Sequence, residues 1–337
     1  MKTLCICGGG ALGHVVAGVL SARKKVRVNV LTERPSFWGT QITVFTPNNS
    51  ALSGEIQKIS SKPEDVIPNA DIVLLCLPGF LIREELLKIK EWLKPGTFVG
   101  SVFASTGFFF EAKKILDKDI PLWGFQRVPF IARVKEYGKS ANLLGYKDSY
   151  NIAVEHALGE SKEKFRSFIE ELFERPTKLL NNYLEASLTN SNPILHTSRL
   201  YAMFHTWHPG MFYSRNVLFY EEWTKEASEL LIAMDDEFFK LLSVLPVSSD
   251  FLPRILDYYG CNDAESLTNK LSSIEGFKGI LAPMKKIDGG WVPDFSNRYY
   301  TEDFPYGLRF IWQLAREHQI ETPTIDRVFE WGMSKIN

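Results

Sequence analysis

The sequence has few cysteines, almost no net charge and no long apolar run. Four cysteines in 337 residues are too few and too scattered for the disulfide framework of a secreted scaffold. Lysine and arginine number 39 against 40 aspartates and glutamates, and a net charge of −1 lacks the basic surface that nucleic-acid binding requires. No apolar run reaches about 18 residues, the length of a membrane-spanning helix.

The start of the chain also lacks the apolar segment of a secretory signal, because Met1–Thr3 leads directly into a strand-like run. We therefore expect a cytoplasmic protein with neither a nucleic-acid nor a membrane partner. Hydrophobic residues make up 45% and aromatic residues 13%, so the chain can build large cores. Its length favours about two domains.

Strand-like and helix-like segments alternate over the first half of the chain. Short apolar runs predict buried strands, and the amphipathic segments between them predict helices. This alternation is typical of an α/β fold with a doubly wound parallel sheet, which we assign to residues 1–178. The predicted strands are Thr3–Cys7, Val26–Leu31, Asp71–Leu77, Thr97–Phe103, Ala141–Leu144 and Tyr150–Val154, and the predicted helices are Ala11–Ala22 and Leu81–Leu93.

Helical periodicity dominates the second half. Few strand signals remain there, so we predict a helical domain over residues 179–337. The predicted helices are Leu184–Asn190, Ile194–Phe204, Trp223–Leu245, Ser266–Leu271 and Leu308–His318.

A glycine-rich turn follows the first predicted strand and opens the first helix. Gly8, Gly10 and Gly13 fit the pattern G-x-G-x-x-G, whose glycines permit a tight turn, a close approach of the pyrophosphate and close helix–strand packing. The helix N-terminus offers amide donors and a positive dipole to the phosphates. The alternative is a glycine-rich turn without a ligand. We predict that the cofactor contacts Gly8, Gly9, Gly10, Ala11, Leu12 and Gly13.

The end of the second predicted strand indicates which dinucleotide binds. An acidic residue there would bind the ribose hydroxyls of NAD. Thr32 occupies that position and Arg34 follows, a pair that suits the 2′-phosphate of NADP. A shift of one residue would place Glu33 there and favour NAD. We predict NADP as the favoured cofactor, with NAD as the alternative.

Two further segments end strands at the carboxyl edge of the sheet, where this fold binds its ligands. Leu77 and Pro78 end the third predicted strand, and Phe103–Gly107 end the next one. Both segments are expected to flank the nicotinamide, and the alternative for each is a strand-end turn without a ligand. His14, which follows the glycine turn, is expected to be an ordinary helix residue.

Three segments in order along the chain resemble the octopine/nopaline (opine) dehydrogenase family. They are the glycine turn at residues 8–13, the segment Asn192-Pro193-Ile194-Leu195-His196, and the late segment from Arg298 to Leu308 that contains Glu302-Asp303-Phe304-Pro305. The resemblance implies an N-terminal Rossmann domain, an all-helical C-terminal domain and an active site between them. It also implies the NAD(P)H-driven reductive condensation of an amino acid with a 2-oxo acid.

By this resemblance His196 matches the family's catalytic histidine and Asp303 its partner carboxylate. An imidazole titrates near neutral pH and can give and take the protons of such a reaction. A carboxylate on its other nitrogen fixes the tautomer. The residues alone would leave His196 more simply explained as a packed histidine.

Arg133 and Asn192 are weaker candidates for substrate binding. A guanidinium at Arg133 suits a substrate carboxylate, although a structural ion pair explains it equally well. Asn192 suits a hydrogen bond to substrate or the N-cap of a helix whose first turn holds Pro193. His205 and His208 have no carboxylate nearby in sequence, so we predict no metal site.

Two other functions stay open. One is a hydroxy-acid dehydrogenase resembling ketopantoate reductase or 6-phosphogluconate dehydrogenase, families that usually place a lysine in the catalytic helix; the segment after Asn192 has none before Phe204. The other is a dinucleotide-binding sensor without turnover. The aromatic segment Trp207–Phe219 suits a homodimer surface or a core.

Overall fold

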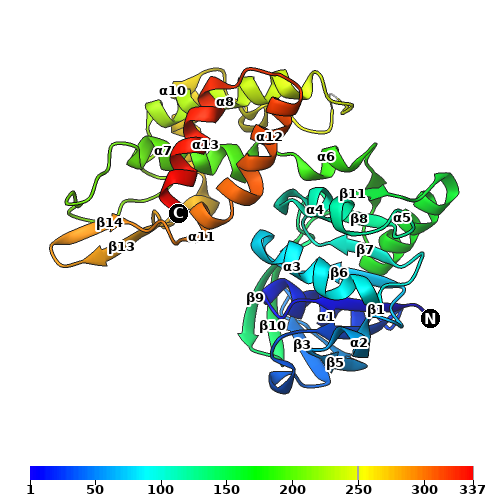
Figure 1. The fold of residues 1–337 in the computed structure, drawn as a ribbon. Helices are drawn as coiled ribbons and strands as arrows, with labels where there is room; N and C mark the ends of the chain where they lie inside the picture. Colours follow the sequence, from blue (N-terminus) through cyan, green and yellow to red (C-terminus); the bar gives the residue numbers. More distant parts are fainter. Residues whose placement is uncertain (249, 337) are drawn as a thin grey trace. The chain divides into compact units, whose positions relative to one another are not determined.

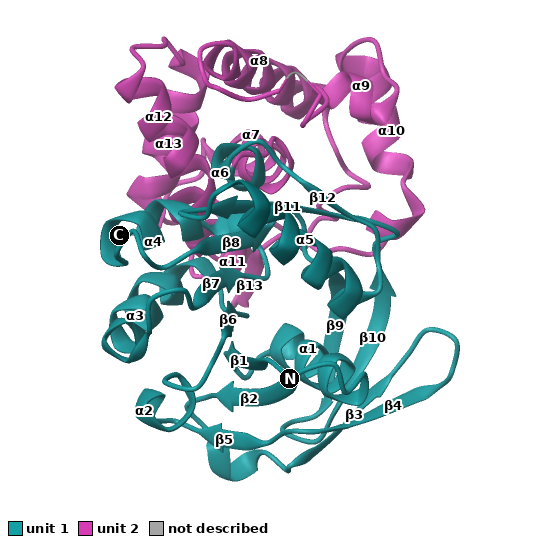
Figure 2. Cartoon of the chain, turned by 90° about the vertical axis from the view of Figure 1, so that its right-hand side faces the viewer, with its two compact units in different colours: residues 1–187 teal, residues 188–337 magenta. Residues whose placement is uncertain are grey.

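A computed structural model describes residues 1–248 and 250–336. The chain divides into two compact units, Met1–Ser187 and Leu188–Asn337, coloured teal and magenta in Figure 2. The short helix α6 (Tyr183–Ser187) belongs to the first unit because it packs on β11 (Tyr150–Glu155). The boundary after residue 178 is a prediction from the sequence, and the compact units divide after Ser187.

Unit 1 contains an eight-stranded sheet in the order β12-β11-β8-β7-β6-β1-β2-β5. Every neighbouring pair is parallel except β8 and β11, which are antiparallel. The strands are β1 (Thr3–Cys7), β2 (Arg27–Leu31), β5 (Lys58–Ser60), β6 (Ile72–Leu75), β7 (Phe98–Ser101), β8 (Leu122–Phe125), β11 and β12 (Thr177–Leu179).

The sheet is buried on both faces, which confirms the predicted doubly wound fold. Alternate residues of a strand face opposite sides. In β1, Leu4 and Ile6 join a core with α1 and α5, whereas Cys5 and Cys7 join a second core with α2, α3 and α4. The helices, seen in Figure 1, are α1 (Ala11–Ala22), α2 (Pro63–Val66), α3 (Gly79–Ile89), α4 (Phe108–Ile115) and α5 (Gly159–Phe173).

A second sheet packs against α1, in the order β4-β3-β10-β9. Residues 141–144 form a strand of the first domain, as predicted, and lie in β10 of this second sheet. Ala141 and Leu143 are buried while Leu144 is exposed, the alternation of a sheet with one covered face. The strands are β3 (Gln41–Phe45), β4 (Ala51–Glu55), β9 (Phe130–Glu136) and β10 (Ser140–Tyr146).

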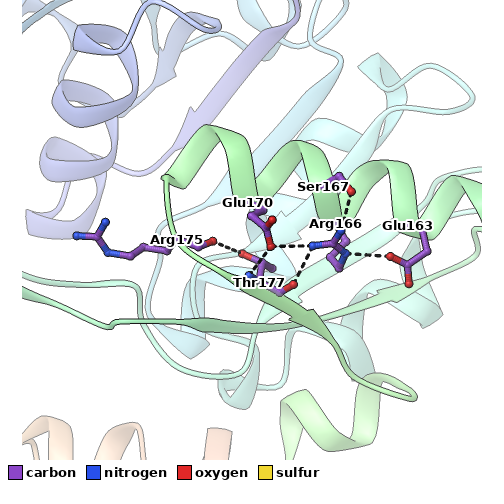
Figure 3. A network of polar contacts seen from close by, with 6 residues as sticks. All are labelled: Glu163, Arg166, Ser167, Glu170, Arg175 and Thr177. Atoms are coloured by element: carbon purple, nitrogen blue, oxygen red, sulfur yellow. Dashed lines mark hydrogen bonds and ion pairs between the residues drawn. The ribbon is translucent and has the colours of Figure 1, made fainter.

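A polar network joins α5 to β12, the outermost strand of the main sheet (Figure 3). Arg166 donates to the Thr177 carbonyl at 3.0 Å and to the Glu170 carboxylate at 2.8 Å, and that carboxylate accepts the Thr177 backbone N–H at 2.8 Å. Arg166 also pairs with Glu163 at 2.9 Å. These bonds satisfy the backbone carbonyl and N–H of Thr177, groups that an uncovered edge strand would leave to solvent.

The described residues of unit 2 are mostly helical, which confirms the predicted helical domain, and they also include a hairpin. Strands β13 (Met284–Ile287) and β14 (Gly290–Pro293) meet at Asp288-Gly289, a frequent hairpin turn whose Gly289 has φ 92°. The helices are α7 (Thr197–Phe204), α8 (Lys225–Leu242), α9 (Ile255–Tyr259), α10 (Ala264–Ser273), α11 (Arg298–Thr301), α12 (Arg309–Glu317) and α13 (Pro323–Ile336). Across both described ranges, no helix is long and apolar enough to cross a membrane.

Candidate active site

The glycine turn of unit 1 has the close packing that its pattern requires. Gly8 has φ 120°, and a Cβ there would lie 2.7 Å from the Cys76 carbonyl oxygen. A Cβ on Gly13 would lie 2.0 Å from the Gly8 carbonyl oxygen. No side chain fits at either position, so both glycines are needed for the strand to turn into α1.

Gly10 differs, because a Cβ there would meet no atom within 4 Å. It is the N-cap of α1 and makes no side-chain cap bond, so the first amides of the helix, those of Ala11, Leu12 and Gly13, lack an acceptor within their own helix. Open space beside first-turn amides fits the pyrophosphate of a dinucleotide.

The end of β2 lies beside this turn. Thr32 is buried, and a Cβ on Gly9 would lie 2.6 Å from its Oγ1. Glu33 instead pairs with Lys88 of α3 at 2.6 Å. Arg34 is exposed, and its backbone nitrogen lies 3.5 Å from Oγ1 of Thr32. Thr32, and not Glu33, is therefore the strand-end residue in contact with the glycines.

Leu77 and Pro78 also meet the turn. A Cβ on Gly8 would lie 2.9 Å from Cδ2 of Leu77, and Pro78 is the N-cap of α3. Of the residues outside the turn that the sequence suggests for the cofactor, Thr32 and Leu77 are thus in contact with its glycines.

His14 has a packing role. Its Nδ1 lies 2.8 Å from the Gly10 carbonyl and its Nε2 accepts the Gly138 backbone N–H at 2.7 Å, which fixes a neutral ring. Burial lowers the pKa of His14. The ring ties α1 to the turn between β9 and β10.

In unit 2, the two candidate catalytic residues each adjoin a π-helical segment. His196 ends the segment Ser191–His196, and Asp303 is the N-cap of the segment Phe304–Leu308. π-helical turns are rare and often occur at functional sites. A Cβ on Gly307 would lie 2.9 Å from Cγ of Pro193, so this glycine lets the two segments pack closely.

His196 and Asp303 form a direct pair, 107 residues apart in sequence. Nδ1 of His196 lies 2.8 Å from Oδ2 of Asp303. A carboxylate only accepts hydrogen bonds, so Nδ1 carries the proton and Nε2 of the neutral ring holds a lone pair. This is the arrangement of a histidine prepared to accept a proton at Nε2.

Residues 179–336 match the family described as NAD/NADP octopine/nopaline dehydrogenase, alpha-helical domain. The family model therefore matches the helical unit of the chain. Tauropine dehydrogenase of Arabella iricolor is 29% identical over 361 residues, covering 98% of this chain and 91% of that protein. The similarity to this dehydrogenase extends over nearly the whole chain.

Solved structures share the fold of this chain. Octopine dehydrogenase with NADH and L-arginine superposes with a TM-score of 0.87 at 24% identity, covering 100% of this chain and 90% of that one. Yersinopine dehydrogenase with NADP+ gives a TM-score of 0.75 at 13% identity, covering 99% and 91%. The Rossmann-type sheet with a helical C-terminal unit is thus the fold of known family members.

Nε2 of His196 has a partner that the sequence did not indicate. The hydroxyl of Tyr220 lies 2.9 Å from it and is buried. The segment Phe219-Tyr220-Glu221-Glu222 resembles the family, yet nothing in its spacing places a hydroxyl on His196.

Arg199, one helical turn after His196, positions this tyrosine. Its guanidinium donates to the Phe219 carbonyl at 3.0 Å and the Glu222 carbonyl at 2.5 Å, on either side of Tyr220. Burial lowers the pKa of Arg199 to about 10. A buried cation that holds two carbonyls fixes the backbone that carries the phenol.

The two candidates for substrate binding are both exposed. Arg133 is exposed on β9 and donates to the adjacent Ala132 carbonyl at 3.0 Å. Asn192 is exposed and is not an N-cap, because the π-helical segment begins at Ser191 with Asn190 as its cap. The N-cap prediction for Asn192 is therefore wrong, since the first turn is wider and starts earlier than an α-helix would.

Among residues 1–248 and 250–336, no group of three or more histidine, cysteine, aspartate or glutamate side chains is placed to hold a metal ion. Nδ1 of His205 bonds to the Tyr201 carbonyl at 2.9 Å, and the ring stacks on Tyr201. His205 is thus a packing residue, as expected.

Proposed function

We propose that this oxidoreductase joins the amine of an amino acid to the carbonyl carbon of a 2-oxo acid, with His196 as the acid–base residue and Asp303 as its partner. The observation that carries the assignment of roles is the 2.8 Å bond between Nδ1 of His196 and Asp303. NAD(P)H supplies the hydride that reduces the condensed carbon. The residues of the chain bind, orient and move protons.

The imidazole serves both halves of the condensation. As the amine attacks the carbonyl carbon, Nε2 is the base that receives a proton from nitrogen, and the imidazolium passes it to the former carbonyl oxygen, which gives a carbinolamine. A second transfer from nitrogen to this oxygen by the same route releases water and leaves the imine that the hydride reduces. Asp303 holds Nδ1–H throughout and stabilises the imidazolium. No lysine lies in residues 192–203, where a hydroxy-acid dehydrogenase of the related families would place one.

We propose NADP as the preferred cofactor. Contacts would come from Gly8 to Gly13, Leu77 and Pro78, with Arg34 on the 2′-phosphate. Thr32 supports this preference, because the residue beside the glycine turn then carries no carboxylate to bind the ribose hydroxyls of NAD. The Glu33 carboxylate forms an ion pair with Lys88 instead. Known family structures contain NADH in one case and NADP+ in another.

Arg133 and Asn192 are proposed as substrate contacts. Both are exposed and both carry polar groups with unused donors, suited to a substrate carboxylate. If this is so, Arg133→Ala and Asn192→Ala raise KM for one substrate and leave NADPH affinity unchanged. Unaltered KM values for every substrate would remove them from the site.

A homodimer and a cytoplasmic location also belong to the proposal. Phe212 in the aromatic segment 207–219 is 57% exposed, which leaves an apolar side chain to be covered. Sedimentation of the pure protein measures its state, and a monomer at micromolar concentration would contradict the dimer. Cell fractionation tests the location.

The direct experiment is a screen of NADPH oxidation that crosses amino acids and other amines with pyruvate, 2-oxoglutarate and glyoxylate. We expect oxidation only when both partners are present. Oxidation with a 2-oxo acid alone would indicate a hydroxy-acid dehydrogenase, and no oxidation with any pair would favour a sensor without turnover.

A further inference from the structure

The nitrogen of His196 that must exchange a proton is already hydrogen-bonded. Because Nδ1 donates to Asp303, the Nε2 lone pair accepts from the Tyr220 hydroxyl at 2.9 Å. The Tyr220 hydroxyl therefore occupies the lone pair with which His196 would take a proton from the substrate. Either Tyr220 leaves when substrate binds, or protons pass through it.

The ring of Tyr220 is held too tightly to leave easily. It stacks on Phe277 with centroids 4.1 Å apart and an interplanar angle of 19°, and packs against Phe219 at 4.9 Å. Trp223 stacks at 6.0 Å. The Arg199 guanidinium fixes the backbone on both sides of Tyr220. Rotation of the hydroxyl hydrogen, in contrast, costs no packing.

We propose that Tyr220 is a proton relay between His196 and the substrate, an inference that rests on the proposed function. In the forward step the O–H bond of Tyr220 breaks as Nε2–H forms, and the tyrosyl oxygen takes the proton from the substrate nitrogen as that N–H bond breaks. Tyr220 is unchanged overall, the substrate loses one proton and His196 gains it. The return of the proton to the leaving oxygen uses the same two bonds in reverse.

The surroundings of the phenol favour a concerted transfer. Burial raises the pKa of Tyr220, and the neighbouring Tyr299, Tyr259 and Asp303 raise it further. A free tyrosinate is thus costly, and the two proton movements must occur together. The charged and titratable groups that face the phenol are these three and His196.

The first test compares the parent enzyme with Tyr220→Phe, which keeps the stacked ring and removes the hydroxyl. We expect kcat to fall by about 10²-fold while the Kd for NADPH stays within about threefold. Turnover measured in H₂O/D₂O mixtures distinguishes a Tyr220 that relays a proton from one that only positions His196. The parent should give a curved proton inventory, because two protons move, and Tyr220→Phe a linear one.

Tyr299→Phe is the matched control, because Tyr299 contacts the His196 ring edge at 4.7 Å without bonding to Nε2. It should retain the curved inventory. If Tyr220→Phe keeps near-parent turnover, or is slow but still curved, the relay is wrong. If the parent itself turns over no amine and oxo-acid pair, the proposed function fails first and the relay with it.

A second variant keeps the relay testable even if Tyr220→Phe misfolds. Incorporation of 3-fluorotyrosine at position 220 keeps the size and packing but makes the phenol more acidic. A relay through this oxygen should change kcat and move the pH at which kcat declines. An unchanged kcat and pH profile would overturn the proposal.

Discussion

At the scale of single residues, the two ring nitrogens of His196 have different roles in the proposed reaction: Nδ1 holds the ring in place and Nε2 exchanges the proton. Asp303 holds Nδ1 and thereby leaves Nε2 as the basic atom. The pair sits in a ring of aromatic side chains, with Phe219 at 5.8 Å and Tyr299 at 4.7 Å from the imidazole. This apolar wall strengthens the charge interaction between Asp303 and an imidazolium.

His196→Ala should lower turnover by about 10²–10⁴-fold, because a positioned acid–base group is lost. Asp303→Asn should lower it similarly, since the amide no longer fixes the Nδ1–H tautomer. NADPH affinity should hardly change, as the cradle residues all lie in unit 1. Single-turnover NADPH oxidation measures the loss.

The double variant should be little worse than the worse single variant, because residues that act as a unit are not additive. Fully additive losses would show that His196 and Asp303 act independently. Near-parent turnover of His196→Ala would remove the imidazole from the mechanism.

Arg34→Ala should weaken NADPH binding by roughly tenfold or more and spare NADH, because a charged hydrogen bond contributes about 1.5–3 kcal/mol. Arg27→Ala is the matched control: Arg27 is exposed at the opposite end of β2, where it donates to the Met1 carbonyl at 3.2 Å. Fluorescence titration gives both affinities. Equal losses for both cofactors, or a parent that prefers NADH, would refute the assignment.

At the scale of elements, the N-terminus of α1 and the two π-helical segments do the positioning. A Cβ at Gly10 meets open space, so Gly10→Val should fold normally and still block the pyrophosphate. We expect loss of NADPH binding with an unchanged circular dichroism spectrum. Parent-like NADPH affinity in the folded variant would rule out this cradle.

Gly307→Ala tests the contact between the π-helical segments. Its Cβ would press on the rigid ring of Pro193, so the segments carrying His196 and Asp303 must separate. A misplacement of this kind is expected to cost up to about 10²-fold in turnover. Gly276→Ala, whose Cβ would meet no atom within 4 Å, is the control and should behave like the parent. Equal activities of the two variants would contradict the proposed role.

The same elements show what the sequence can and cannot predict. The glycine turn and the main strands are local patterns, and the order of the three motifs indicates His196 and Asp303. The position of Tyr220 depends on the buried Arg199 and on stacking against Phe277, which are tertiary contacts that no local pattern predicts. The π-helical turn shifts the cap from Asn192 to Asn190, and no local propensity indicates such a shift.

At the scale of the whole molecule, the proposed reaction uses residues of both units. Unit 1 has the glycine cradle and unit 2 has the pair of His196 and Asp303. Related folds also serve ketopantoate reductase, with a TM-score of 0.66 at 14% identity, so the fold alone does not select the reaction. The chemical structure of the product must therefore show which reaction the enzyme catalyses.

The most direct test of the reaction follows the hydride into the product. NADPH deuterated at the transferable position is incubated with the enzyme, an amino acid and a 2-oxo acid from an active pair, and the products are analysed by mass spectrometry. We expect a secondary amine with deuterium on the former carbonyl carbon, formed only when both substrates are present. Deuterium found instead in a 2-hydroxy acid, with no secondary amine, would contradict the assignment.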